Sequence, residues 1–327
     1  MPKLVVRHES WPIAGTFTIS RGSKTSCETV VVELHEDGFK GWGECVPYAR
    51  YGETVETVIQ EIEGLRDAIE NGLTREELQI RMKAGAARNA IDCAFWDFEA
   101  KKSGKAVWEL AGLAKAPVAL TTAYTISLGT PDVMGKQALE NASRPLMKLK
   151  LTGDGDLERV AAVRENAPNT RLIVDANEGW SVEHVAPFSE KLQAYGVEMI
   201  EQPLPSAEDD LLKTVEHPIA LCADESAHAC ADFHKLVGKY EMVNIKLDKT
   251  GGLTEALKLQ KMARDADMQV MIGCMLAGSL AMAPAHIVGQ DAEVVDLDGP
   301  LLIAKDRDVA FEFEGSSMLP APRDLWG

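Results

Sequence analysis

The sequence lacks the features of an exported or membrane-spanning chain. No run reaches the roughly 20 apolar residues that a membrane span requires, and the first residues show no basic-then-apolar export pattern. The six cysteines form no CxxC pair, and most of them lie inside apolar segments. Cysteines of this kind are typical of small buried side chains in a reducing compartment. We therefore expect a cytoplasmic protein without a membrane partner.

Positive charge is scarce, and the common phosphate and hydrolase motifs are absent. The chain has 34 Lys and Arg against 51 Asp and Glu, a formal net charge of −17, which disfavours nucleic acid as a partner. There is no Walker loop, no GxGxxG after a strand and no GxSxG. The Gly251-Gly252 pair is a weak phosphate signal that a tight turn explains. An anionic substrate stays open, because a bound cation and lysines can invert the local field.

The order of the expected elements predicts two domains. Apolar residues make up 46% of the 327 residues, enough for full cores. Residues 1–112 read as short alternating strands followed by helices, an α+β capping domain. In residues 118–300 strands alternate with helices, and eight strand-like runs predict a TIM-like (β/α)7β barrel. Residues 301–327 break this rhythm, and we expect them to pack back on the capping domain.

Three acids stand late in three successive apolar runs of the expected barrel. Asp175, Glu201 and Asp224 are separated by roughly one strand-plus-helix unit. Each alone would be read as a helix N-cap or turn residue, but three in register favour an oxygen site of the kind that Mg²⁺ prefers. Asn177 lies two residues after Asp175, and we interpret it as a helix cap in preference to a neighbour of the metal site.

Lysines stand at the ends of the runs on either side of these acids. Lys148 and Lys150 are two apart, so they share a strand face that we expect to point into the barrel. Two ammonium groups so close should lower each other's pKa, which would suit a lysine that acts as a base. Lys246 ends the run four strands further on, nearly opposite in an eight-stranded barrel. The arrangement indicates proton removal from one face of a carbon and delivery from either face.

These motifs carry a resemblance to a known family. The KxK, Asp, Glu, Asp-Glu-Ser and NIKLxKxGG series resembles the enolase superfamily, muconate-lactonizing subgroup, and within it the dipeptide epimerases. The resemblance implies that the three acids bind Mg²⁺, that Lys150 and Lys246 are the acid/base pair and that Lys148 supports Lys150. The implied reaction is epimerisation of the C-terminal residue of a dipeptide, with L-Ala-D/L-Glu expected first. Two lysines would transfer the proton through a metal-stabilised enolate.

The resemblance also implies contacts with a small dipeptide substrate. Asp296 and Asp298 form a DxD that would hold its free α-ammonium, although Asp298 alone also fits a turn before Gly299-Pro300. Lys24 ends an RGSK turn where the relatives have RGSR, so it would meet the side-chain carboxylate without the bidentate fork of Arg. We therefore still expect a dipeptide whose second residue is acidic, and we expect the enzyme to accept a broader range of second residues. Thr122 and Tyr124 would line the cavity or form strand core.

Other functions stay open at this stage. A superfamily cycloisomerase or an o-succinylbenzoate synthase-like dehydratase would use the same acids and lysines on a substrate without an α-ammonium. A Schiff-base aldolase explains one lysine but not three carboxylates, and a non-catalytic barrel explains neither. None of the seven histidines ends a barrel strand, which disfavours the relatives with a His base. The resemblance further implies a role in murein peptide recycling, and it leaves a homo-oligomer open.

Overall fold

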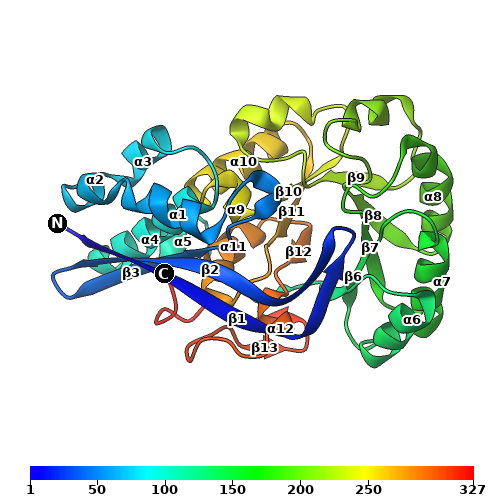
Figure 1. The fold of residues 1–327 in the computed structure, drawn as a ribbon, viewed down its shortest axis with the longest axis horizontal. Coiled ribbons are helices and arrows are strands. Elements are labelled where there is room, and N and C mark those ends of the chain that lie inside the picture. The colour runs from blue at the N-terminus through cyan, green and yellow to red at the C-terminus, as the bar shows by residue number, and fades with distance from the viewer.

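The computed structural model describes residues 1–327, and its N-terminal part is a three-stranded antiparallel sheet covered by helices (Figure 1). Its long first two strands form a hairpin whose tip reaches toward the barrel (Figure 1). A separate apolar core lies between this sheet and its helices. The elements are β1 (Lys3–Ile19), β2 (Gly22–Glu36), β3 (Phe39–Cys45), η1 (Ala49–Tyr51), α1 (Val55–Glu63), α2 (Arg66–Glu70), α3 (Arg75–Arg81), α4 (Ala86–Ser103) and α5 (Val107–Leu110).

The rest of the chain is built on an eight-stranded parallel sheet in sequential order, which confirms the predicted barrel fold. The sheet closes where the Ala123 amide donates to the Val295 carbonyl, at 2.8 Å. The strands are β5 (Tyr124–Ile126), β6 (Leu146–Lys150), β7 (Arg171–Asp175), β8 (Val197–Glu201), β9 (Ala220–Ala223), β10 (Met242–Ile245), β11 (Gln269–Gly273) and β12 (Val294–Asp296).

Helices connect most of these strands, but two connections differ from the expected alternation. The segments after β8 and β9 contain only the short 3-10 helices η2 (Asp209–Thr214) and η3 (Cys230–Lys235). Pro203, Pro205 and Pro218 bracket the first of these, and proline removes a helical N–H donor. The α-helices are α6 (Pro131–Glu140), α7 (Asp156–Asn166), α8 (Val182–Ala194), α9 (Leu247–Thr250), α10 (Leu253–Asp265), α11 (Ser279–Gly289) and α12 (Gly299–Leu302). No helix of the fold has the length and apolar character that crossing a membrane demands.

Apolar side chains fill the barrel from the start to the middle of its strands. Eight buried residues, one from each strand or its immediate approach, form a separate cluster: Ala123, Leu146, Ile173, Met199, Cys222, Met242, Met271 and Val294. Polar side chains inside the barrel therefore gather at the opposite, carboxyl end of the strands, where active sites of such barrels lie.

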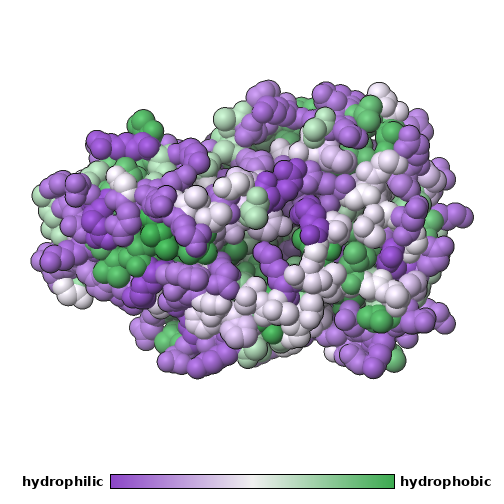
Figure 2. Space-filling view, in the orientation of Figure 1, coloured by the Kyte–Doolittle hydropathy of each residue, from purple (hydrophilic) through white to green (hydrophobic).

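The C-terminal tail touches both parts of the chain. Its strands β13 (Phe313–Glu314) and β14 (Ser317–Met318) pair with each other, and β14 also pairs with β4 (Leu120–Thr121), which precedes the barrel. Its last residues return to α4, where the Trp326 indole donates to the Cys93 carbonyl at 3.1 Å and the Gly327 amide donates to Asp97 at 2.7 Å. Figure 2 shows that the face seen in Figure 1 is mainly hydrophilic, in keeping with the strongly acidic composition.

Helix α4 docks directly on the Gly251-Gly252 turn that follows Lys246. The Arg88 guanidinium donates to the Gly251 carbonyl at 3.1 Å, and the Asp92 carboxylate accepts from the Thr254 amide at 2.9 Å. A Cβ atom on Gly252 would overlap the Asp92 carboxylate, and its φ of +112° suits glycine. The turn therefore serves helix docking beside Lys246, and the phosphate interpretation is not needed.

Replacing Gly252 by Ala should destabilise the protein by several kcal/mol. The left-handed backbone costs an L-residue about 1–2 kcal/mol, and overlap with a packed neighbour adds about 1–3 kcal/mol. Gly238→Ala is the matched control, because Gly238 also has a positive φ of +79° but nothing within 4 Å of the added Cβ. Urea unfolding should give the larger loss for Gly252→Ala, and equal losses would contradict the docking argument.

Candidate active site

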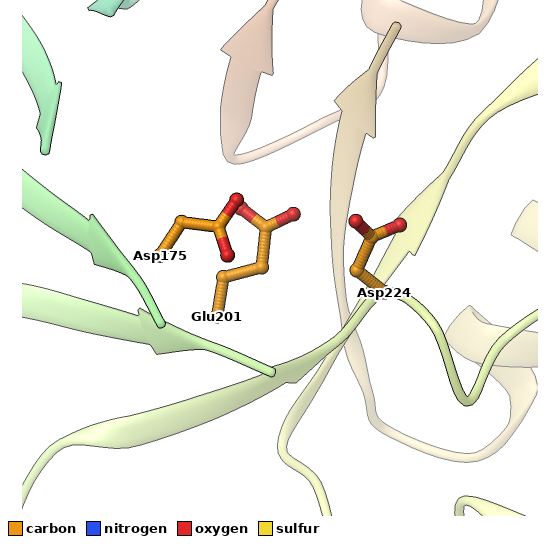
Figure 3. A group of neighbouring side chains, drawn as sticks. All are labelled: Asp175, Glu201 and Asp224. Carbon is orange, nitrogen blue, oxygen red and sulfur yellow. The ribbon is translucent and has the colours of Figure 1, made fainter. Parts of the chain in front are cut away.

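Three carboxylates meet at the carboxyl ends of β7, β8 and β9. Asp175 and Glu201 are the last residues of their strands and lie directly opposite each other in the parallel register, while Asp224 follows β9 by one residue. One oxygen from each lies within 4.8 Å of the others, and all three side chains are buried. Figure 3 shows them turned toward one shared space. They form an acidic metal site.

Two lysines flank this group from the neighbouring strands. Lys150 ends β6, and its Nζ lies 2.7 Å from an oxygen of Asp175. Lys246 follows β10, and its Nζ lies 2.6 Å from an oxygen of Asp224. Since β6 and β10 are the outer members of five consecutive strands, the acids lie between the two amines. The structure thus brings together the acids and lysines that the sequence singled out.

Lys148 lies deeper than Lys150 and differs from the expectation for it. Its Nζ is 2.6 Å from Glu201, 2.8 Å from Asp296 and 3.2 Å from Asp175. Burial opposes its charge, but Asp296, Glu201 and Asp175 outweigh burial and raise the pKa of Lys148 well above its ordinary value. The idea that the paired lysines lower each other's pKa is therefore wrong for Lys148, because the carboxylates are closer partners.

The electrostatics of the acids suit a hard divalent cation. Burial and the charge of Asp175 raise the pKa of Glu201 to about 7, whereas the pKa of Asp224 is lowered because Lys246 and Lys249 outweigh its burial. A set of three buried carboxylate oxygens is the donor type that Mg²⁺ prefers. A cation held by these oxygens would favour their ionised forms and offset their mutual repulsion. The residues therefore fit a metal ion.

Three further polar residues hold the acids in place. The Asn177 amide group donates to Asp175 at 3.1 Å, Asn244 donates to Glu201 at 2.7 Å, and the Lys249 amine lies 2.6 Å from Asp224. The capping role expected for Asn177 is wrong, since Ser181 occupies the N-cap of the next helix. Asn244 lies two residues before Lys246, so the period of a strand could have revealed it. Lys249 is the second lysine of the NIKLxKxGG motif, but nothing in the motif indicates its contact with Asp224.

A cavity of about 740 Å³ opens above the acids, between the hairpin tip and the barrel. Lys24 lines it from the hairpin, with its Nζ 5.5 Å from the centre of the Tyr48 ring. Arg21 crosses from the same tip to the barrel and donates to Glu225 at 2.8 Å and to the Asn177 carbonyl at 3.0 Å. The capping domain therefore supplies one wall of the site. Its contacts reach Asn177 and Glu225, which lie within two residues of the acids in sequence.

The remaining predicted substrate contacts are engaged within the protein. Asp296 accepts from Lys148, and Asp298 accepts from the Thr125 amide at 2.7 Å. The Thr122 hydroxyl accepts from the Leu297 amide at 2.8 Å, which helps to close the barrel. The lining of the cavity includes none of Asp296, Asp298, Thr122 and Tyr124. Burial and the charge of Asp296 raise the pKa of Asp298 to about 6.

Comparison with known proteins identifies the family. Residues 1–112 match the mandelate racemase/muconate lactonizing enzyme N-terminal domain, and residues 134–299 match the enolase C-terminal domain-like family. The chain is 46% identical over 315 residues to the L-Ala-D/L-Glu epimerase of Escherichia coli K12, covering 96% of this chain and 98% of that one. It is 44% identical over 302 residues to an N-acetyl-D-glutamate racemase of a Pseudoalteromonas species, covering 91% and 95%.

Solved structures agree with these relatives. An enolase family member from Agrobacterium tumefaciens with homology to dipeptide epimerases, bound to sodium and L-Ala-L-Glu, matches with a TM-score of 0.98 and 48% identity over 100% of both chains. A dipeptide epimerase from Enterococcus faecalis, complexed with Mg and L-Leu-L-Tyr, matches with a TM-score of 0.91 and 28% identity over 98% and 97%. The chain therefore belongs to the mandelate racemase/muconate lactonizing enzyme family of the enolase superfamily. Within that family it is an isomerase, a dipeptide epimerase.

Mg²⁺ should stabilise the folded protein, and neutralising one acid should remove the effect. A ligand that binds only the folded state stabilises it by about 2.7 kcal/mol at 100 times its Kd, which corresponds to a rise in Tm of roughly 5 °C for a large domain. Thermal unfolding with and without Mg²⁺ measures this rise in the wild type and in Glu201→Gln, which keeps the side-chain shape. An equal Mg²⁺-induced rise in the variant would rule out Glu201 as a ligand.

Proposed function

We propose that this dipeptide epimerase inverts the α-carbon of the C-terminal residue of L-Ala-D/L-Glu with Mg²⁺ in its acidic site. The observation that carries the proposal is the placement of Lys150 and Lys246 at the ends of the strands that flank the acids. The E. coli relative named for this substrate supports the choice of dipeptide. The crystallised Mg complex of the Enterococcus faecalis enzyme supports the choice of metal.

Lys150 and Lys246 act as the acid/base pair in this proposal. In one direction, neutral Lys150 takes the α-proton and charged Lys246 delivers a proton to the opposite face, and in the other direction the roles are exchanged. Each amine lies against a different carboxylate, Asp175 or Asp224, so the two amines are held apart by the acids. A Mg²⁺ ion bound by Asp175, Glu201 and Asp224 would supply positive charge to offset the negative charge that develops when the α-proton leaves.

Lys148 supports this arrangement as a positioning residue. Its ammonium group touches two of the proposed metal ligands and Asp296, and it is almost completely buried, with 1% of its surface exposed. A buried ammonium with three carboxylate partners is well compensated, so we propose that Lys148 stays charged throughout the reaction. It thereby offsets negative charge near Lys150 and fixes the orientation of Glu201.

We propose separate contacts for the side-chain carboxylate and for the α-ammonium of the dipeptide. Lys24 faces the cavity from the hairpin and can meet a side-chain carboxylate with a single ammonium group, which is less directional than an Arg fork. Asp296 and Asp298 are the acids proposed to hold the α-ammonium. A buried carboxylate pair of this kind attracts a cation, since the charge on Asp296 already opposes ionisation of Asp298.

A second candidate function is racemisation of an N-acyl-glutamate that has no α-ammonium. The Pseudoalteromonas relative is named for N-acetyl-D-glutamate, and Asp296 and Asp298 already have partners within the protein. L-Ala-L-Glu is itself an N-acylated glutamate, so the reacting carbon and its neighbours are the same in both substrates. The two substrates differ only in the acyl group, because alanyl carries an α-ammonium and one more carbon than acetyl.

The division of the chain supports a separate capping role. We propose domain boundaries at residues 1–112 and 118–300, since the capping part has an apolar core of its own, while the barrel core also takes in Cys93 and Trp96 of α4. The tail, residues 301–327, would belong structurally to both, because it pairs with β4 and also returns to α4.

Removing either flanking lysine should abolish epimerisation but leave one-sided proton exchange. General acid or base groups contribute about 10²–10⁴-fold each, so Lys150→Ala and Lys246→Ala should lose at least 100-fold in turnover. In D₂O, each variant should wash out the α-proton of only one epimer, the one whose proton faces the remaining lysine. Mass spectrometry of both epimers measures this exchange.

Lys101→Ala is the control for that experiment, because Lys101 forms an ion pair with Asp97 far from the acids. It should exchange both epimers at the wild-type rate. Full activity of either site variant toward both epimers would show that the two-lysine scheme is wrong.

Replacing Asp298 by Asn should separate the two candidate substrates. Asn is isosteric and still accepts from the Thr125 amide, but it carries no charge. A hydrogen-bonded ion is worth about 1.5–3 kcal/mol, so kcat/KM for L-Ala-L-Glu should fall at least 10-fold, while that for N-acetyl-L-glutamate stays unchanged. If wild type turns over N-acetyl-L-glutamate best and the variant affects neither substrate, the dipeptide assignment is wrong.

A further inference from the structure

A buried glutamine joins the strand ends that carry two of the metal ligands. Gln202 follows Glu201 directly, and its side chain is fully buried. Its Oε1 accepts from the backbone amides of Asp224, at 2.9 Å, and Ser226, at 3.1 Å. One side chain therefore links the end of β8 to the loop after β9, where the third acid stands.

The opposite end of the amide fixes which way it points. Gln202 Nε2 donates to the Leu204 carbonyl at 2.8 Å and lies 3.0 Å from the Tyr240 hydroxyl. That hydroxyl donates to Asp209 at 3.2 Å, and Asp209 is paired with Lys239 at 2.5 Å. Because a backbone carbonyl only accepts, the nitrogen end of the amide must face Leu204. The amide oxygen is consequently directed at the Asp224 amide.

The backbone of Gln202 is strained. Gln202 has a φ of +34°, in the left-handed region that favours glycine. Keeping a non-glycine residue there costs about 1–3 kcal/mol and persists only where the surroundings hold it. The surroundings here are hydrogen bonds on both ends of the side chain, together with the bond from the Gln202 amide to the Cys222 carbonyl at 2.9 Å. A glycine would relieve the strain but break the link to Asp224.

We infer that Gln202 is a positioning residue that sets the spacing between Glu201 and Asp224 and thereby the metal affinity of the site. It does not contribute a metal ligand or touch substrate. Groups that orient metal ligands typically change metal affinity by about 10–100-fold when they are lost. The inference rests on the metal-binding part of the proposed function, and it is independent of which substrate the enzyme prefers.

The test compares Mg²⁺ binding and folding stability in Gln202→Met. Methionine has a similar length but cannot hydrogen-bond in this way, so the Kd for Mg²⁺, measured by titration calorimetry without substrate, should rise at least 10-fold. Tyr240→Phe removes the hydroxyl that orients the amide and should raise the Kd by a smaller factor. It decides the question if Gln202→Met does not fold.

Gln260→Met is the matched control, because Gln260 is another buried amide. It donates to the carbonyls of Val288 and Asp291, away from the acids. Both glutamine variants should lose stability to urea, but only Gln202→Met should lose Mg²⁺ affinity. A folded Gln202→Met whose Kd stays within twofold of wild type would overturn the inference. Since no substrate is used, an inactive wild type that binds Mg²⁺ would instead overturn the proposed function alone.

Discussion

The structure depends on keeping three negative charges together inside the barrel. Buried carboxylates are costly unless they are paired and hydrogen-bonded, and here the compensation comes from the neighbouring strands. Lys150 and Lys246 lie at the two sides of the group, while Lys148 lies beneath it, against Glu201 and Asp175. The charged atoms of this cluster are supplied at strand ends or within two residues of them, so the parallel register of the barrel determines its geometry.

The same constraint explains the neutral and cationic groups that contact the acids. Asn177, Asn244 and Lys249 each occupy an oxygen of one acid. Each therefore limits the directions from which a ligand can approach. Such outer contacts are as much a part of a metal centre as its ligands. The capping domain completes the enclosure from above, through the Arg21 contacts with Glu225 and the Asn177 carbonyl.

The sequence was sufficient to predict the barrel, its eight strands and the meeting of Asp175, Glu201 and Asp224, because strand periodicity places side chains on faces and parallel strands align their ends. The sequence was insufficient to predict contacts between side chains that are distant in the chain. From the sequence, Lys148 was expected to share a lowered pKa with its neighbour Lys150. In the structure, burial opposes its charge, but carboxylates from three other strands outweigh burial and raise its pKa. Asn177 was interpreted as a cap because no local pattern indicates its positive φ of 47° or its side-chain contact with Asp175.

The apolar side chains inside the barrel have a consequence for how reactant and product reach the site. They fill the interior from the start to the middle of the strands, while the cavity lies toward the carboxyl ends, under the hairpin. Reactant and product therefore use the same opening, that of the cavity. For an isomerase, whose two compounds differ only in the configuration of one carbon, a common route costs nothing in selectivity.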